Sequence, residues 1–173
     1  MLNRLDKIRT KPTTQKMRGA VAVELALLLV FILVPLIFGI ADLGRMLYQY
    51  NALTKSVRDG AKLMSLCNHD PAFAANYATF QTQATNLVVF GSTATATAPL
   101  VPGLTTGDVE IEPDPGDPPI VVGAVRVVTV TVSGFSLGYI TGLPQILGIP
   151  ALQTFSNIST TMRQSDTCAA PFA

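Results

Sequence analysis

The longest hydrophobic segment of the chain runs from Ala20 to Ala41 and carries a single charged residue, Glu24. An α-helix of this length rises about 33 Å, which is enough to cross a hydrocarbon core of about 30 Å. The pattern therefore predicts a membrane-spanning helix over residues 20–41.

Beyond Ala41 the pattern changes, because apolar residues now recur every three or four positions with polar residues between them. The apolar set is Leu43, Met46, Leu47, Tyr50, Leu53, Val57, Ala61 and Met64, and the polar set is Arg45, Gln49, Lys55, Asp59 and Lys62. This is typical of an amphipathic helix, which we expect to continue the span without a break over residues 42–66. Its apolar face would serve as the spine of the domain that follows.

A second helix is predicted after the first. Asp70 followed by Pro71 is a good N-cap and first-position pair, and Gly91 is a good stop signal. Between them one apolar face is formed by Phe73, Tyr77, Phe80, Ala84, Leu87 and Val88. The alternation of threonine and alanine in Ser92–Ala98 is compatible with either a thin polar strand or a linker.

The C-terminal half of the chain has the composition of β-strands. Alternation predicts a strand at Val109–Glu112, and β-branched residues predict strands at Val121–Val132 and Thr154–Met162. Residues 113–119 are predicted as a turn-rich loop, and residues 134–150 as irregular with one short helical turn near Gln145. We therefore expect an α+β fold, in which a small antiparallel sheet within residues 67–173 packs against the long helix.

The distribution of charged residues predicts how the span is oriented in the membrane. The chain of 173 residues allows one modest domain beside the span. Six of its 12 Lys and Arg residues precede the span: Arg4, Lys7, Arg9, Lys11, Lys16 and Arg18. Basic residues at one end of a span keep that end in the cytoplasm, so the C-terminal domain should be exported. This short leader, residues 1–19, has no aromatic residues interleaved with its charges, so we expect no nucleic-acid partner.

A cleaved secretory signal is the alternative to a retained span. Gly39-Ile40-Ala41 offers a tolerable cleavage site, and Pro35 precedes it as a helix breaker. The apolar run is long for a signal peptide, however, and an ordinary signal core gains nothing from Glu24. The retained span is therefore favoured.

The order of features from Arg18 to Ser65 resembles that of a known family. A basic leader and Gly19 are followed by small apolar residues, Glu24, the long apolar run, and a helix containing Asn51–Leu53 and Arg58–Lys62. This order is similar to that of the TadE-like minor pseudopilins of the tight-adherence (Tad, or Flp) pilus systems. A weaker similarity extends to Asn86–Gly91 and the last predicted strand. Leu25 departs from the family pattern, which often has an aromatic residue after the glutamate.

The resemblance implies a processing site. In that family a prepilin peptidase cuts after the glycine, which would remove the leader and leave Ala20 as the mature N-terminus with Glu24 as the fifth residue. The alternative is a permanent cytoplasmic tail that only sets topology. The resemblance also implies the inner membrane as location, and as partners a prepilin peptidase, a TadF-like pseudopilin, the major Flp pilin, an inner-membrane assembly platform and membrane lipid. It implies no cofactor.

Glu24 is the candidate assembly residue. A carboxylate within an apolar span costs a few kcal/mol, so it is by default functional and has a partner. Cleavage after Gly19 would give Ala20 a positive α-amino group at neutral pH. Glu24 of one subunit could pair with this ammonium group in a neighbour and so fix the axial register. Pairing within one helix, or a glutamate that only reaches the headgroups, are the alternatives.

Cys67 and Cys168 are the only cysteines. In an exported domain an even number favours a disulfide. The alternative, a metal site made of Cys67, His69, Asp70 and Cys168, lacks the paired Cys-x-x-Cys spacing of strong zinc sites. The acidic residues Asp108, Glu110, Glu112, Asp114 and Asp117 lack EF-hand spacing, so a solvated acidic edge is favoured over a calcium site.

Enzymatic chemistry is not expected. Gly134–Gly138 matches the G-x-S-x-G pattern of a nucleophile elbow, but no histidine follows Ser136 and the only one, His69, lies upstream. We therefore predict no catalytic residue. The alternative to a pseudopilin is an unprocessed single-pass anchor that presents a periplasmic binding or sensing domain.

Overall fold

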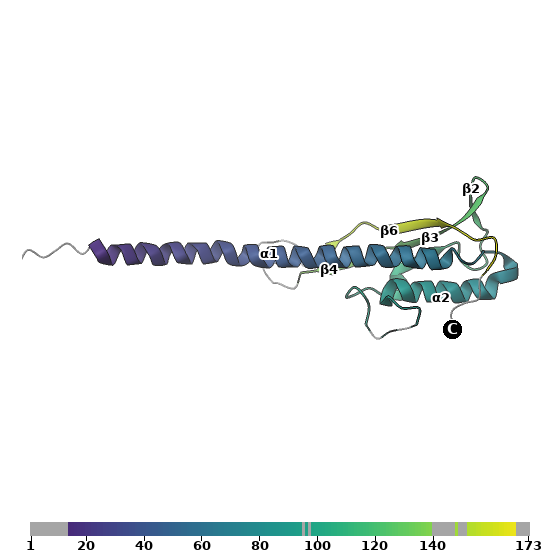
Figure 1. Cartoon of the computed structure of the whole chain (residues 1–173), viewed down its shortest axis with the longest axis horizontal. Helices are drawn as coiled ribbons and strands as arrows, with labels where there is room; N and C mark the ends of the chain where they lie inside the picture. The colour runs from purple at the N-terminus through teal and green to yellow at the C-terminus, as the bar shows by residue number, and fades with distance from the viewer. Residues whose placement is uncertain (1–13, 95, 97, 140–147, 149–151, 169–173) are drawn as a thin grey trace, which may run out of the picture. The chain divides into compact units, whose positions relative to one another are not determined.

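The computed structural model describes residues 14–94, 96, 98–139, 148 and 152–168, and the chain divides into two compact units, Met1–Ala41 and Asp42–Ala173 (Figure 1). Helix α1 spans Thr14–Met64 and so contributes to both units. The prediction of one continuous helix through the apolar run and the amphipathic segment is thereby confirmed.

The first unit, where described, consists of the N-terminal part of α1. Its large apolar side chains are exposed, for example Leu25 at 64% and Phe31 at 73%. Among the described residues, Gly19–Met64 contains the one helical segment that is long and apolar enough to cross a membrane. Side chains of this kind are suited to a lipid environment, because in water their exposure would be unfavourable.

In the second unit, α1 packs by a narrower face than we expected. Four apolar residues of the predicted face are fully buried: Leu53, Val57, Ala61 and Met64. Leu43 and Leu47, however, are 58% and 55% exposed, whereas the polar residue Gln49 is only 8% exposed. The predicted face was therefore wrong at Leu43 and Leu47, although Met46 between them is buried as predicted. The buried face lies on the side of Asp42, Met46 and Gln49 there, with two polar side chains among its members.

The second helix forms as predicted. A 3₁₀ turn, η1 (Pro71–Phe73), leads into α2 (Ala74–Phe90), and Asp70 caps the turn by accepting a hydrogen bond from the Ala72 N–H at 3.0 Å. Gly91 ends α2 in the left-handed conformation, with φ 73°, and donates its N–H to the Leu87 carbonyl. The face that α2 buries comprises Tyr77, Phe80, Ala84, Val88 and Val89.

The main sheet is antiparallel and is built around one central strand. Strand β3 (Val125–Val132) pairs along its length with β6 (Ile158–Arg163). On its other side it pairs with β1 (Val109–Glu112), which follows the 3₁₀ turn η2 (Thr106–Asp108), and with β2 (Ile120–Val122). Strands β4 (Ser136–Gly138) and β5 (Leu152–Thr154) form a separate two-stranded ladder. The α+β class and the small antiparallel sheet are confirmed.

Three strand boundaries differ from the predictions. The segment predicted as one strand from Val121 to Val132 is a hairpin, because Gly123 adopts φ 67° and turns the chain between β2 and β3. The last predicted strand is two strands, β5 and β6, separated by residues 155–157. Part of the segment predicted as irregular forms β4. The turn predicted near Gln145 lies outside the described residues, and Ser92–Ala94, Ala96 and Ala98 are not in a strand.

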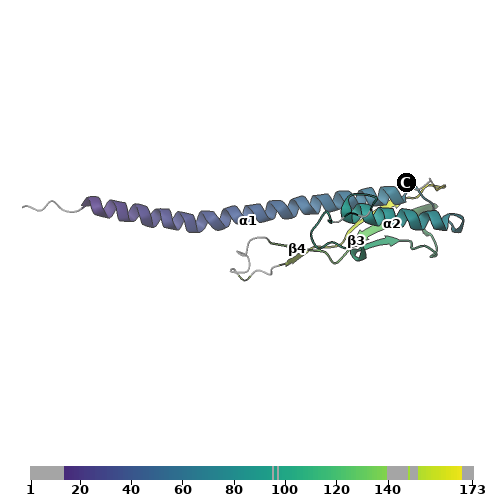
Figure 2. The ribbon, with the colours of Figure 1, turned by 90° about the horizontal axis from the view of Figure 1, so that it is seen from below.

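In the second unit the helices lie over one face of the sheet (Figure 2). The buried side chains of the core lie between the helices and this face. Val128, Val130 and Val132 point into it from β3 and are fully buried, whereas Thr129 and Thr131, which alternate with them, belong to the opposite face. The sheet is therefore covered on one side, and its other face carries mostly hydroxyl and charged side chains.

Candidate functional site

The candidate processing site lies within helix α1. Gly19, Ala20 and Glu24 are all helical and all exposed, and a side chain added at Gly19 would meet no atom within 4 Å. Ala20 and Glu24 are four residues apart, so they share one face of the helix. The Gly19–Ala20 peptide bond therefore lies between two exposed residues of this helix. Neither cleavage at this bond nor an assembly role of Glu24 is tested by the geometry, and both stay predictions.

Glu24 is surrounded along the helix by exposed apolar residues. Val21 and Val23 are each 63% exposed, and Leu25 is 64% exposed. If this surface lies in a membrane, the Glu24 carboxylate occupies an apolar environment in which it requires a polar partner. The isolated chain therefore presents Glu24 in a position to meet a partner from outside.

The two cysteines lie next to each other just after the C-terminal end of α1. Cys67 and Cys168 form a disulfide that joins positions 101 residues apart in the sequence. The bond is accompanied by a hydrogen bond from the Ser165 N–H to the Ser65 carbonyl at 2.8 Å, and by one from Asn68 Nδ2 to the Asp166 carbonyl at 3.2 Å. The segment after β6 is thus fastened to the end of α1, and the two thiols are bonded to each other rather than free to ligate a metal.

Arg126 links this region to the central strand. Its guanidinium donates to Asn68 Oδ1 at 2.6 Å and lies 3.7 Å from Asp70 Oδ2. Asp70 therefore both caps the 3₁₀ turn and faces a cation. Sequence reasoning missed Arg126, because no local signal connects it to residues nearly 60 positions earlier.

The His69 and Tyr77 side chains hold the loop after β1. His69 Nε2 donates to the Asp114 carbonyl at 2.7 Å, and the Tyr77 hydroxyl donates to the Pro113 carbonyl at 2.8 Å. The two rings meet edge to face with centroids 4.6 Å apart. Burial raises the pKa of the Tyr77 phenol above its ordinary value of 10.0. His69 Nε2 and the Tyr77 hydroxyl thus hold the loop through its backbone carbonyls, whereas His69 Nδ1 is buried without a hydrogen-bond partner among the described residues.

The other two motifs considered in the sequence, the G-x-S-x-G segment and the acidic residues, do not form a reactive site among the described residues. Ser136 lies within strand β4, which pairs with β5, and not at the strand-to-helix turn that a nucleophile elbow requires. Of the acidic residues, Asp108 accepts hydrogen bonds from Thr105, and Asp114 accepts one from Gln81. Glu110 and Glu112 point to the exposed face of β1. No cluster of three potential metal ligands occurs among the residues that the structure describes.

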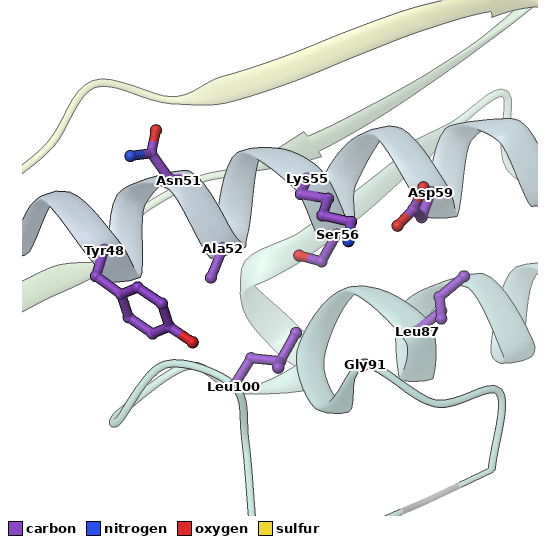
Figure 3. A pocket seen from close by; sticks show the side chains of 9 residues that line it. All are labelled: Tyr48, Asn51, Ala52, Lys55, Ser56, Asp59, Leu87, Gly91 and Leu100. Atoms are coloured by element: carbon purple, nitrogen blue, oxygen red, sulfur yellow. The ribbon is translucent and has the colours of Figure 1, made fainter.

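A groove with a volume of about 500 Å³ runs between the second-unit part of α1 and the end of α2 (Figure 3). Its α1 side is formed by Tyr48, Asn51, Ala52, Lys55, Ser56 and Asp59, and its other side by Leu87, Gly91 and Leu100. Lys55 and Asp59 are one helical turn apart on its rim. Tyr48, which is 75% exposed, lies at one end.

Comparison with known proteins gives one match. Residues 19–62 match the family described as TadE-like protein. No match was found among curated proteins or among solved structures. The matched segment begins at Gly19 and ends in the last turn of α1, so it contains the predicted processing site, the span and most of the amphipathic part. The resemblance inferred from the sequence is confirmed over this segment: residues 19–62 match the TadE-like family, and this similarity suggests involvement in Tad pilus assembly.

Proposed function

We propose that this protein is a minor pseudopilin that is cut by a prepilin peptidase after Gly19 and takes part in building a Tad-type pilus. The observation that carries the proposal is the TadE-like match over residues 19–62, which starts at the glycine predicted to be the cleavage site. The presence of one helix that could span a membrane in the same segment supports it.

The basic leader supports the orientation that this function needs. A cytoplasmic peptidase site requires residues 1–19 to stay inside, and basic residues before a span have that effect. The second unit is then exported. Its disulfide between Cys67 and Cys168 fits an oxidising compartment, where such bonds form and persist.

Glu24 is the residue that recruits the subunit in this proposal. Its carboxylate pairs with the Ala20 ammonium of a neighbouring subunit and thereby fixes the axial register as the helix leaves the bilayer. The neighbours are the TadF-like pseudopilin and the major Flp pilin, held by the inner-membrane assembly platform. The span packs against their apolar helices as it is extracted, so that its hydrophobic surface stays covered.

The test is piliation of a strain that lacks this gene and carries a variant copy. We expect Glu24→Gln to lower the number of surface pili at least about tenfold, because an uncharged amide loses the charge-assisted pairing. The variant should still be cut and still reach the membrane at the normal level. Leu27→Ala, one turn away and also exposed, serves as the matched control and should leave piliation unchanged.

Two results would reject the proposal at different levels. Normal piliation with Glu24→Gln would remove the register role from Glu24 while leaving the protein in the pilus system. Normal piliation in the strain without the gene would remove the protein from pilus assembly, and a plain membrane anchor would then describe it better.

A further inference from the structure

The main sheet has one edge that is open and one that is closed. On the closed side, β1 is in contact with α2, and Ile111 in its middle is only 3% exposed. The strand also carries Glu110 and Glu112 and runs directly into Pro113. Charged side chains and proline are devices by which proteins prevent an edge from pairing with another strand.

The other edge is formed by β6, at the border of the sheet in Figure 1. The Gln164 N–H donates to the Arg126 carbonyl, and these two residues are next to the paired positions Arg163 and Val127. In an antiparallel ladder the hydrogen-bonded positions alternate. Thr160 and Met162 therefore bond to β3, and the N–H and C=O groups of Ser159, Thr161 and Arg163 point away from the sheet.

These outward groups are accessible. Ser159, Thr161 and Arg163 are exposed, and no strand pairs with this edge among the residues that the structure describes. Apart from Arg163 at its end, β6 carries neither the charged side chains nor the proline that protect β1. It is therefore a template for one additional strand.

The charge on β6 indicates which kind of partner strand would pair with this edge. Arg163 is the only charged residue of β6, and within the described part of the chain it has no carboxylate within ion-pair distance. An added strand lies about 4.8 Å away, so its side chains are directly beside those of β6. A carboxylate beside Arg163 is favourable and a cation there is not.

We propose that the outer edge of β6 is a docking site for an extended, acidic segment of a partner protein, which adds to the sheet as a fifth strand. Backbone groups of Ser159, Thr161 and Arg163 supply the hydrogen bonds, and Arg163 selects a partner with a carboxylate at its side. This inference concerns the second unit alone and does not depend on cleavage after Gly19.

The probe for the test is a seven-residue peptide of alternating valine and glutamate with capped ends, added to the full-length protein in detergent micelles. Amide hydrogen exchange is measured residue by residue. The peptide should slow exchange at Ser159, Thr161 and Arg163 by at least about tenfold, which corresponds to about 1.4 kcal/mol. Thr160, whose N–H already bonds to β3, should change little.

Variants separate the edge from the neighbouring sheet face. Arg163→Glu should abolish protection by the glutamate peptide and permit protection by its lysine counterpart. Thr131→Lys changes the same sheet face one strand further in, beside Ser159 in the register, and should leave protection intact.

The inference would be overturned by any of three results. The first is an absence of protection at the outward amides. The second is equal loss of protection with Thr131→Lys, which would assign binding to the sheet face. The third is protection that rises with protein concentration in the absence of peptide, which would make the edge a contact between copies of this chain.

Discussion

The His69 and Tyr77 side chains show how single polar residues position a loop that carries four prolines. Each donates one hydrogen bond to a carbonyl of the loop after β1, at Asp114 and Pro113 respectively. The Asp114 carbonyl also accepts a hydrogen bond from the Asp117 N–H at 3.0 Å, so His69 adds a second bond to a turn that the backbone already closes. Burial removes the phenol from water and so raises its pKa, because the charged phenolate is poorly solvated there.

This raised pKa predicts a loss of stability in alkali. The phenol ionises at about 10 in the unfolded chain and at a higher pH in the folded one, so its contribution is complete below pH 10 and declines as the pH rises further. Tyr77→Phe should cost about 1 kcal/mol at neutral pH through the lost hydrogen bond, but should flatten the decline above pH 10. Denaturant unfolding at several pH values measures both effects.

Tyr48→Phe is the matched control, because Tyr48 is 75% exposed. It should leave both the neutral-pH stability and the alkaline decline unchanged. Parallel declines for Tyr77→Phe and the unaltered protein would show that the Tyr77 phenol does not carry the effect.

Helices α1 and α2 lie close to each other at Gly60. A Cβ at this position would lie 2.6 Å from Val88 Cγ2 and 3.4 Å from the Ala84 carbonyl oxygen. Val88 is fully buried and β-branched, so it cannot rotate away easily. Glycine is thus required here for helix packing, although glycine inside a helix costs about 1 kcal/mol relative to alanine.

Gly60→Ala should therefore destabilise the second unit by about 1–3 kcal/mol, despite the better helix propensity of alanine. The double change Gly60→Ala with Val88→Ala should be less destabilised than the sum of the two single changes, because the smaller side chain makes room for the new methyl group. Gly44→Ala, where a Cβ meets nothing within 4 Å, should be neutral or slightly stabilising. The measurement is thermal unfolding of Gly60→Ala, Val88→Ala, the double variant and Gly44→Ala. If the destabilisations by Gly60→Ala and Val88→Ala simply add in the double variant, the packing explanation is contradicted.

Among the secondary-structure elements, the boundaries set by short-range interactions could be predicted from the sequence. Asp70, Pro71 and Gly91 gave the boundaries of the second helix, because caps act within a few residues. The strand break at Gly123 was missed, since the β-branched residues on both sides favour a strand in either arrangement. The buried face of α1 was misjudged at Leu43 and Leu47, because a helical wheel identifies apolar positions but not which of them the folded domain covers.

The candidate functional residues could also be predicted only where the signal is local in the sequence. Gly19, Ala20 and Glu24 stand out from sequence alone, because a carboxylate in an apolar run is unusual. Arg126 and the β6 edge could not be found, since they depend on strand pairing across long stretches of chain. The pairing of Cys67 with Cys168 was predictable only because the chain contains no other cysteine.

For the molecule as a whole, the disulfide is the main covalent restraint on the second unit. It closes a loop of 101 residues, for which the chain-entropy model gives a stabilisation of about 4–5 kcal/mol, with smaller values often delivered in practice. The bond joins the chain just after α1 to the last described residue, so helix α2 and all the strands lie within the loop, whereas the α1 part of the second unit precedes it.

Replacing both cysteines by serine should accordingly lower the free energy of unfolding by about 2–5 kcal/mol. Adding a reductant should shift the unaltered protein toward the same melting temperature while leaving the double variant unaffected. Equal melting temperatures for the oxidised protein and the double variant would show that the bond contributes nothing to stability.

The most direct test of the proposed function is the mass of the mature N-terminal peptide in the membrane fraction, compared between the unaltered protein and Gly19→Ala. We predict a chain that starts at Ala20, and a Gly19→Ala variant that keeps its leader because the peptidase no longer recognises the site. An intact Met1 terminus in the unaltered protein would contradict processing and favour an unprocessed anchor. A start at Asp42 would contradict a retained span altogether.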